Sequence, residues 1–145
     1  MALLRLEYNP RMETESTIQT SIVSILRMFG YIVIEIGRTR RMVPCQRCGA
    51  KTPAIGWQGN TPGAPDLMVT TGRWGNIWTG LEVKRHGGAI RPEQRALLDN
   101  GSIAIVRSVR DALGQIIEIE ERFGVDASRL REVRDQLQED ASTAG

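Results

Sequence analysis

Two carboxylates and a lysine lie in two short apolar segments near the middle of the chain. Asp66 belongs to Pro65–Val69, and Glu82 and Lys84 belong to Gly80–Lys84. Core strands rarely carry charged side chains, so charges in such apolar runs suggest a chemical role. Carboxylate oxygens suit magnesium or manganese, and an ammonium group beside such an ion could act on a phosphate or a water molecule.

The residues between these segments, Thr70–Asn76, are rich in turn-forming types and predict a β-hairpin. If Trp74 is its centre, Asp66 falls opposite Glu82, because each lies eight residues away. Directly paired residues have Cβ atoms ~5 Å apart, and at an effective dielectric of ~20 two charges at that separation repel by roughly 3 kcal/mol. A divalent cation would turn this repulsion into attraction. An exposed hairpin with a surface Glu–Lys pair is the alternative interpretation.

A helix is predicted before the hairpin, starting at Asn9-Pro10 or at Thr14 and ending at Gly30. Glu15 and Gln19 lie on its apolar stripe, which is either where the helix emerges into water or where it delivers a carboxylate to a site. The alternating residues that follow predict a strand over Tyr31–Ile36.

Helices and one strand are predicted after the hairpin. Pro92 should begin a helix with Gln94 on its inner face, and Ile103–Val106 should form an apolar strand. A capping-box pattern at Ser108 opens a further helix. A last helix, from about Asp126 to Glu139, shows only a narrow apolar seam, made of Leu130, Val133 and Leu137.

The chain of 145 residues fits one domain, with a core at about 10–107, an insertion at 37–63, C-terminal helices at 109–139 and a disordered tail at 141–145. It lacks an apolar run of the ~20 residues that a membrane span needs, and its start lacks the apolar core of a signal peptide. We therefore expect a cytoplasmic protein without a membrane partner. The chain has three tryptophans, Trp57, Trp74 and Trp78. Each could pack in the core or stack on bases, and Trp78 is expected in the core.

The insertion shows no periodicity and is basic, although the net charge of the whole chain is only +2. A local basic patch on a nearly neutral protein suits a phosphate backbone, whereas a solvated loop is the plainer interpretation. The predicted DNA-binding residues are Arg38, Arg40, Arg41, Arg47, Lys51 and Arg85.

The insertion also holds the two cysteines, Cys45 and Cys48. A zinc deaminase would need a His-x-Glu upstream, which this chain lacks. A thioredoxin-type site would need the cysteines between a strand and a helix, whereas these are expected in a loop. A zinc ion wants four ligands, so His86 or a second copy of the chain would have to contribute. Two free or loosely paired thiols are the other possibility. We expect at most one zinc per two chains.

Four motifs in order resemble those of the PD-(D/E)XK nuclease superfamily, and most closely its VRR-NUC branch, in the stand-alone bacterial or phage type. They are Glu15–Gln19, Gly63–Leu67, Glu82–Lys84 and Arg91–Gln94, and the resemblance spans about Glu15 to Val106. It implies an α/β fold with a restriction-endonuclease-like core, α-β-β-β-α-β, in which helices flank a mixed sheet. The two C-terminal helices would be additions to this core.

The resemblance also implies the roles of the site residues. Asp66, Glu82 and the carbonyl of Val83 would bind Mg²⁺ or Mn²⁺, and Glu15 would act through a metal-bound water or a second ion. Lys84 would position or deprotonate the attacking water and offset charge on the phosphate. Gln94 would orient the site or the substrate strand. Arg91 departs from the small hydroxyl residue that the family more often has there, which makes the start of that helix less certain.

The implied activity is that of a metal-dependent DNA endonuclease. Stand-alone members of this family act as homodimers on four-way junctions, which suggests a homodimer that nicks Holliday junctions or other branched DNA. The Leu130, Val133 and Leu137 seam and the cysteine-bearing insertion could supply an interface. A non-hydrolytic nucleic-acid-binding or assembly module with the same fold is the alternative.

Overall fold

The computed structural model describes residues 13–36, 42–53 and 63–143 and shows a mixed α/β fold. The main elements are α1 (Glu15–Met28), β1 (Ile32–Glu35), β4 (Leu67–Thr70), β5 (Thr79–Val83), α2 (Pro92–Asp99), β6 (Ile103–Val106), α3 (Val109–Arg122) and α4 (Ser128–Thr143). Between β1 and β4 lie the short strands β2 (Met42–Pro44) and β3 (Lys51–Pro53), and β4 and β5 are joined through a 3₁₀ turn, η1 (Gly72–Trp74). The order of the main elements is the predicted one, including two helices after β6.

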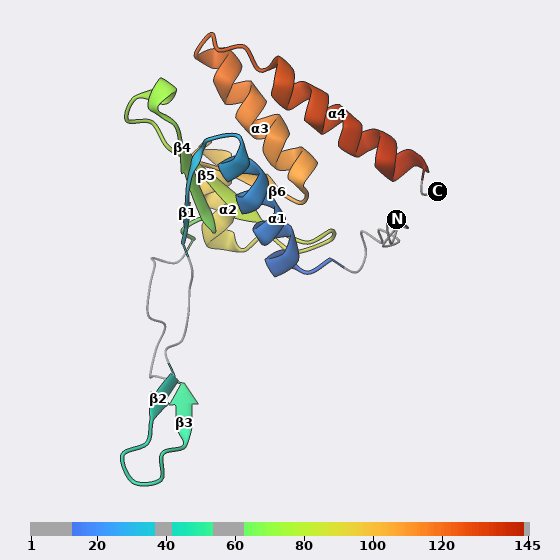
Figure 1. The fold of residues 1–145 in the computed structure, drawn as a ribbon. Coiled ribbons are helices and arrows are strands. Elements are labelled where there is room, and N and C mark those ends of the chain that lie inside the picture. The colour runs from blue at the N-terminus through green and yellow to red at the C-terminus, as the bar shows by residue number, and fades with distance from the viewer. Residues whose placement is uncertain (1–12, 37–41, 54–62, 144–145) are drawn as a thin grey trace.

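The four long strands form one mixed sheet in the order β1-β4-β5-β6. The pairs β1–β4 and β4–β5 are antiparallel, and β5–β6 is parallel, with α2 as its crossover. Helices α1 and α3 pack on one face of the sheet and share its buried apolar side chains, and α4 lies on the outside of α3 (Figure 1). Helix α2 contacts β6.

The predicted register of the hairpin is confirmed. Leu67 pairs with Leu81 and Val69 with Thr79, so the next step outward places Asp66 opposite Glu82. Val83 is buried in the core, as expected from the alternation along β5.

Helix α1 begins at the second of its two candidate caps. The hydroxyl of Thr14 accepts a hydrogen bond of 3.1 Å from the N–H of Thr17. This satisfies one of the free N–H groups at the helix start, so Glu15 becomes the first helical residue. Asn9 and Pro10 lie outside the described residues.

The insertion contains a hairpin that the sequence pattern did not predict. β2 and β3 pair antiparallel, and the turn between them is closed by the N–H of Cys45 on the carbonyl of Ala50, at 2.8 Å. Strands of three residues are too short to show an alternating pattern. This small sheet lies well away from the four-stranded sheet (Figure 1).

The C-terminal seam packs within the chain. Leu130 is buried in the core, and Val133 and Leu137 pack against it, so α4 rests on α3. The seam therefore does not offer the free interface that was predicted as one possibility. Helix α4 also runs to Thr143, which corrects the predicted disorder of 141–143, while 144–145 lie outside the described residues.

Two of the tryptophans are described, and they differ. Trp74 is buried, whereas Trp78 is 41% exposed, so the prediction of a core position for Trp78 is wrong. Trp78 precedes the first residue of β5 and so lies outside the strand, whose residues Gly80 to Val83 are the buried ones. Trp57 lies outside the described residues. Among the described helices, none combines the length and the apolar character that crossing a membrane requires.

Candidate active site

The end of the sheet where β4 begins and β5 ends gathers the predicted catalytic residues. Asp66 is partly buried there, and its Oδ2 accepts a hydrogen bond of 2.8 Å from the N–H of Val83. Glu82 is only 3% exposed and Lys84 only 6%. The exposed-hairpin interpretation is therefore wrong, because the charged side chains are inside the protein.

Gly80 allows the chain to approach closely at this point. A Cβ atom at Gly80 would lie 2.9 Å from Cγ of Pro65 and 3.1 Å from Cγ2 of Ile103. The ring of Pro65 therefore occupies the space above β5 that a side chain would fill. This contact fixes the chain just before Asp66.

Glu82 is held by two neighbours through one of its two oxygens. Its Oε1 accepts a hydrogen bond from Nζ of Lys84 at 2.9 Å and another from Nε2 of Gln94. Its Oε2 is buried and has no hydrogen-bond partner among the residues that the structure describes. An unsatisfied buried carboxylate oxygen is costly, so this atom calls for a positively charged ligand or a hydrogen-bond donor.

Burial, together with a neighbouring negative charge, disfavours the charged form of each carboxylate. Burial raises the pKa of Glu82, and the charge of Asp66 raises it further, against hydrogen bonds from Lys84 and Gln94. Burial likewise raises the pKa of Asp66, and the charge of Glu15 adds to it, against the Val83 N–H and the charge of Lys84. A bound cation would favour the charged form of each group.

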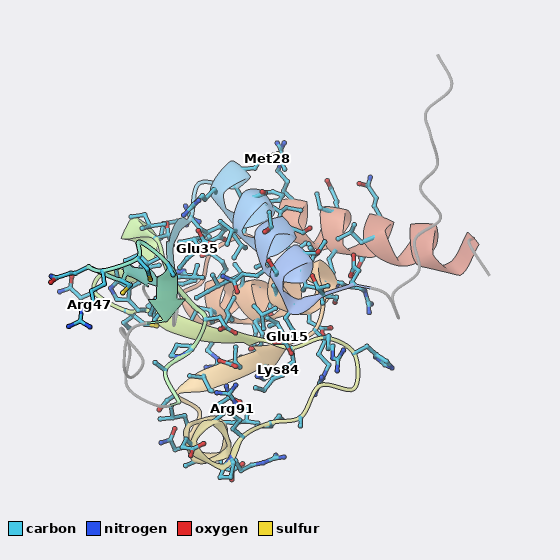
Figure 2. All side chains as sticks on the ribbon, turned by 90° about the horizontal axis from the view of Figure 1, so that it is seen from below. Glu15, Met28, Glu35, Arg47, Lys84 and Arg91 are labelled. Atoms are coloured by element: carbon cyan, nitrogen blue, oxygen red, sulfur yellow. The ribbon has the colours of Figure 1, made fainter. Side chains whose placement is uncertain are left out.

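Glu15 reaches the same region from the start of α1, as predicted. Its charge acts on Asp66, and its Oε1 accepts a hydrogen bond of 3.4 Å from the N–H of Arg85. Figure 2 shows Glu15, Lys84 and Arg91 at the same side of the molecule. The charge of Arg91 opposes the rise in the pKa of Asp66. Arg91 is thus an additional residue of the site, which the sequence analysis treated only as a helix start.

Gln94 connects the start of α2 to Glu82. It is 5% exposed, and its Oε1 accepts a hydrogen bond of 3.0 Å from the N–H of Arg91 while its amide group bonds to Glu82. Helix α2 begins at Pro92 as predicted, and the Gln94 amide oxygen satisfies the N–H of Arg91, which is one half of a capping box. Arg91 therefore does not disturb the helix start.

Asp66 and Glu82 fit a divalent cation. They provide paired carboxylates, an oxygen that has no partner among the described residues, and pKa values raised chiefly by burial. Among residues 13–36, 42–53 and 63–143, no three His, Cys, Asp or Glu side chains group closely enough to hold a metal ion. Among the described residues, only the side chains of Asp66 and Glu82 would then coordinate the ion. The carbonyl of Val83 and a water near Glu15 stay predicted ligands.

The predicted DNA-binding and zinc residues fall in different parts of the structure. Arg47 and Cys48 are exposed and Cys45 is partly exposed in the turn between β2 and β3. Hydrogen bonds from the backbone N–H groups of Cys48 and Arg47 lower the pKa of the Cys45 thiol. Arg85 is exposed beside Glu15. Lys51 lies in β3, and three predicted contacts fall outside the described residues, namely Arg38, Arg40 and Arg41.

A buried glutamate far from the site was missed. Glu120 of α3 is 1% exposed and accepts hydrogen bonds from Tyr31 Oη at 2.5 Å, from Arg73 at 2.5 Å and from Trp74 Nε1 at 3.1 Å. Burial would raise its pKa, but these three donors outweigh burial and lower it. Glu120 follows the buried Ile116 and Ile117 by four and three residues, so helical spacing could have placed it on the inner face. It fastens the hairpin tip to α3.

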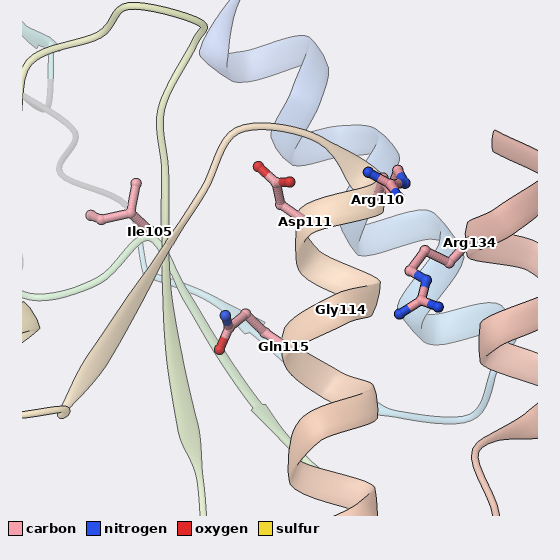
Figure 3. A pocket seen from close by; sticks show the side chains of 6 residues that line it. All are labelled: Ile105, Arg110, Asp111, Gly114, Gln115 and Arg134. Atoms are coloured by element: carbon pink, nitrogen blue, oxygen red, sulfur yellow. The ribbon is translucent and has the colours of Figure 1, made fainter. Parts of the chain in front are cut away.

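A cavity of about 420 Å³ lies between β6, α3 and α4 (Figure 3). None of the predicted catalytic residues lines it. Its lining residues are Ile105, Arg110, Asp111, Gly114, Gln115 and Arg134.

Comparison of the chain with protein-family models, with curated proteins and with solved structures finds no match.

Proposed function

We propose that this protein is a metal-dependent DNA endonuclease with a restriction-endonuclease-like fold of the PD-(D/E)XK type. The observation that carries the proposal is Glu82, a buried carboxylate opposite Asp66. One of its oxygens bonds to Lys84, and the other has no partner in the described part of the chain. In the large majority of cases the buried oxygens of a structural glutamate are hydrogen-bonded. The predicted order of elements and the predicted register support the same assignment.

In this proposal Asp66 and Glu82 hold Mg²⁺ or Mn²⁺, which would supply positive charge for a phosphodiester transition state. Lys84 reaches the same point with an ammonium group 2.9 Å from Glu82. That group can donate a hydrogen bond to a phosphate oxygen or orient the attacking water. Gln94 keeps Glu82 in place, and Glu15 is exposed, so that it can accept a hydrogen bond from water.

DNA would approach along the exposed basic residues near the site and in the insertion. Arg85 follows Lys84 directly, and Arg47 is exposed in the β2–β3 turn. Phosphate contacts of this kind position a substrate without reading its sequence. A cytoplasmic location belongs to the same proposal.

A homodimer that nicks four-way junctions is the substrate part of the proposal. One such site cuts one strand, and a twofold pair of sites would match the symmetry of a junction. Light scattering at micromolar concentration tests the dimer. Faster cleavage of flaps or single strands than of junctions would contradict the junction as substrate.

The activity is tested by incubating the full chain with junction, duplex and single-stranded DNA, with Mg²⁺ or with EDTA. We expect cleavage only with the metal. Glu82→Gln should abolish cleavage and leave DNA binding intact, because loss of a negative charge does not weaken contact with phosphate. Glu35→Gln, an exposed glutamate on β1, is the matched control and should cut normally. Cleavage by Glu82→Gln at the wild-type rate would refute the assignment.

A further inference from the structure

The turn between β2 and β3 presents two thiols on a hydrogen-bonded backbone. The N–H of Cys45 bonds to the carbonyl of Ala50 at 2.8 Å, and the N–H of Gly49 bonds to the carbonyl of Cys45 at 2.9 Å. Both thiols are free and reach the surface. The spacing C-x₂-C on such a turn is that of half of a tetrahedral zinc site, in which thiolates are the commonest ligands.

The chain itself cannot complete the site with sulfur or nitrogen ligands. It contains two cysteines and one histidine. His86 lies on the loop after β5, and no group of three His, Cys, Asp or Glu forms among the described residues. The segments that flank the hairpin, 37–41 and 54–62, contain none of these four residue types. The missing thiolates must therefore come from another molecule.

We propose that Cys45 and Cys48 from two copies of this chain together bind one zinc ion. A second copy supplies the same pair of thiols, related by a twofold axis through the metal, and completes four ligands. The β2–β3 hairpin lies away from the four-stranded sheet (Figure 1), so two hairpins can meet without a clash between the two sheets.

The charges around the cysteines suit this arrangement. Zinc with four thiolates carries a net charge of −2. Arg47 lies between the two cysteines and is exposed, so two copies bring two positive charges to the metal. Without a metal, the same approach would place like charges together and be unfavourable. The two hairpins would therefore associate only when zinc is bound.

Native mass spectrometry and metal analysis of the purified full chain test the proposal. We expect one zinc per two chains, found only in the dimer peak. Replacement of zinc by Co²⁺ should give the visible absorption of a tetrahedral thiolate site. Cys45→Ser and Cys48→Ser should each lose the metal while their circular dichroism stays that of the wild type, and His86→Ala should keep it.

Three results would overturn the proposal: one zinc per chain, zinc in the monomer peak, or loss of zinc from His86→Ala. The proposal would also be overturned if the purified protein contained no zinc and took up none when zinc was added. None of these results depends on DNA cleavage. Glu82→Gln should bind zinc like the wild type, so failure of the nuclease proposal and failure of the zinc proposal can be told apart.

Discussion

Replacing Asp66 by asparagine should make the metal-free protein more stable while it abolishes cleavage. The side chain keeps its shape, and an amide oxygen can still accept the hydrogen bond from the N–H of Val83. The substitution removes the repulsion between Asp66 and Glu82, which at ~5 Å and an effective dielectric of ~20 is roughly 3 kcal/mol. The attraction of Asp66 to Lys84 and Arg91 is lost as well and opposes this gain.

The net gain in the free energy of unfolding should be about 1–2 kcal/mol, since Lys84 keeps Glu82 as a partner. For a chain of this size each kcal/mol raises the melting temperature by about 2–4 °C. Thermal unfolding in EDTA at neutral pH measures the gain. In Mg²⁺ the wild type should gain stability and the variant should not. The exposed Asp99→Asn is the matched control and should change stability by less than ~0.5 kcal/mol.

The pH dependence supplies a second check on the same reasoning. The pKa of Asp66 is raised in the folded protein, so folding favours its neutral form. The charged Asp66 therefore destabilises the wild type fully above that raised pKa. This destabilisation shrinks as pH falls from the raised pKa toward the unfolded value, and it is absent below the unfolded value. The difference between variant and wild type should shrink toward zero on acidification. A variant that is less stable than the wild type in EDTA at neutral pH would refute this account of the site.

Three further predictions follow from other residues. Lys84→Ala should lower the turnover rate by at least ~100-fold with DNA binding retained, because it removes one transition-state or general-base contact. Glu120→Ala should cost about 2–4 kcal/mol in chemical denaturation, because the buried donors of Tyr31 and Trp74 lose their acceptor, whereas the half-exposed Arg73 can turn to water. The pKa of Glu120 is lowered, so its contribution is present above the unfolded value and is lost as pH falls through the lowered one. Neutralising Arg38, Arg40 and Arg41 should weaken binding to every DNA and flatten the salt dependence by roughly one unit of slope per lost contact.

Each of these has a result that would contradict it. A large loss of metal affinity in Lys84→Ala would make Lys84 a structural residue. Glu118→Ala, on the exposed side of the same helix, should cost little, and an equal loss in both glutamate variants would remove the special role of Glu120. An unchanged salt slope would make the arginine stretch an ordinary solvated loop.

The hairpin was predictable because its information is local. Turn-forming residues around Trp74 and apolar runs on both sides determine the register, and the register brings Asp66 to Glu82. The cap at Thr14 and the helix start at Pro92 are local signals of the same kind.

Contacts between distant parts of the chain were not predictable in this way. Tyr31 and Glu120 are 89 residues apart in sequence, and no local pattern links them. The packing of Leu130 against the core, rather than against a partner chain, is decided by the position of α3. The unpartnered oxygen of Glu82 likewise depends on how Lys84 and Gln94 share the other oxygen.

The place where the insertion joins the sheet determines how freely the length and sequence of the insertion can change. The insertion begins after β1 and ends before β4, and these two strands are antiparallel neighbours. The N–H of Ile36 also bonds to the carbonyl of Asp66 at 2.7 Å. The ends of the loop are therefore held together by the sheet, whatever lies between them. Doubling the length of a loop with fixed ends costs only about 0.6 kcal/mol in closure entropy. The insertion can thus be lengthened, shortened or exchanged at little cost to folding, and any new segment would emerge directly beside Asp66.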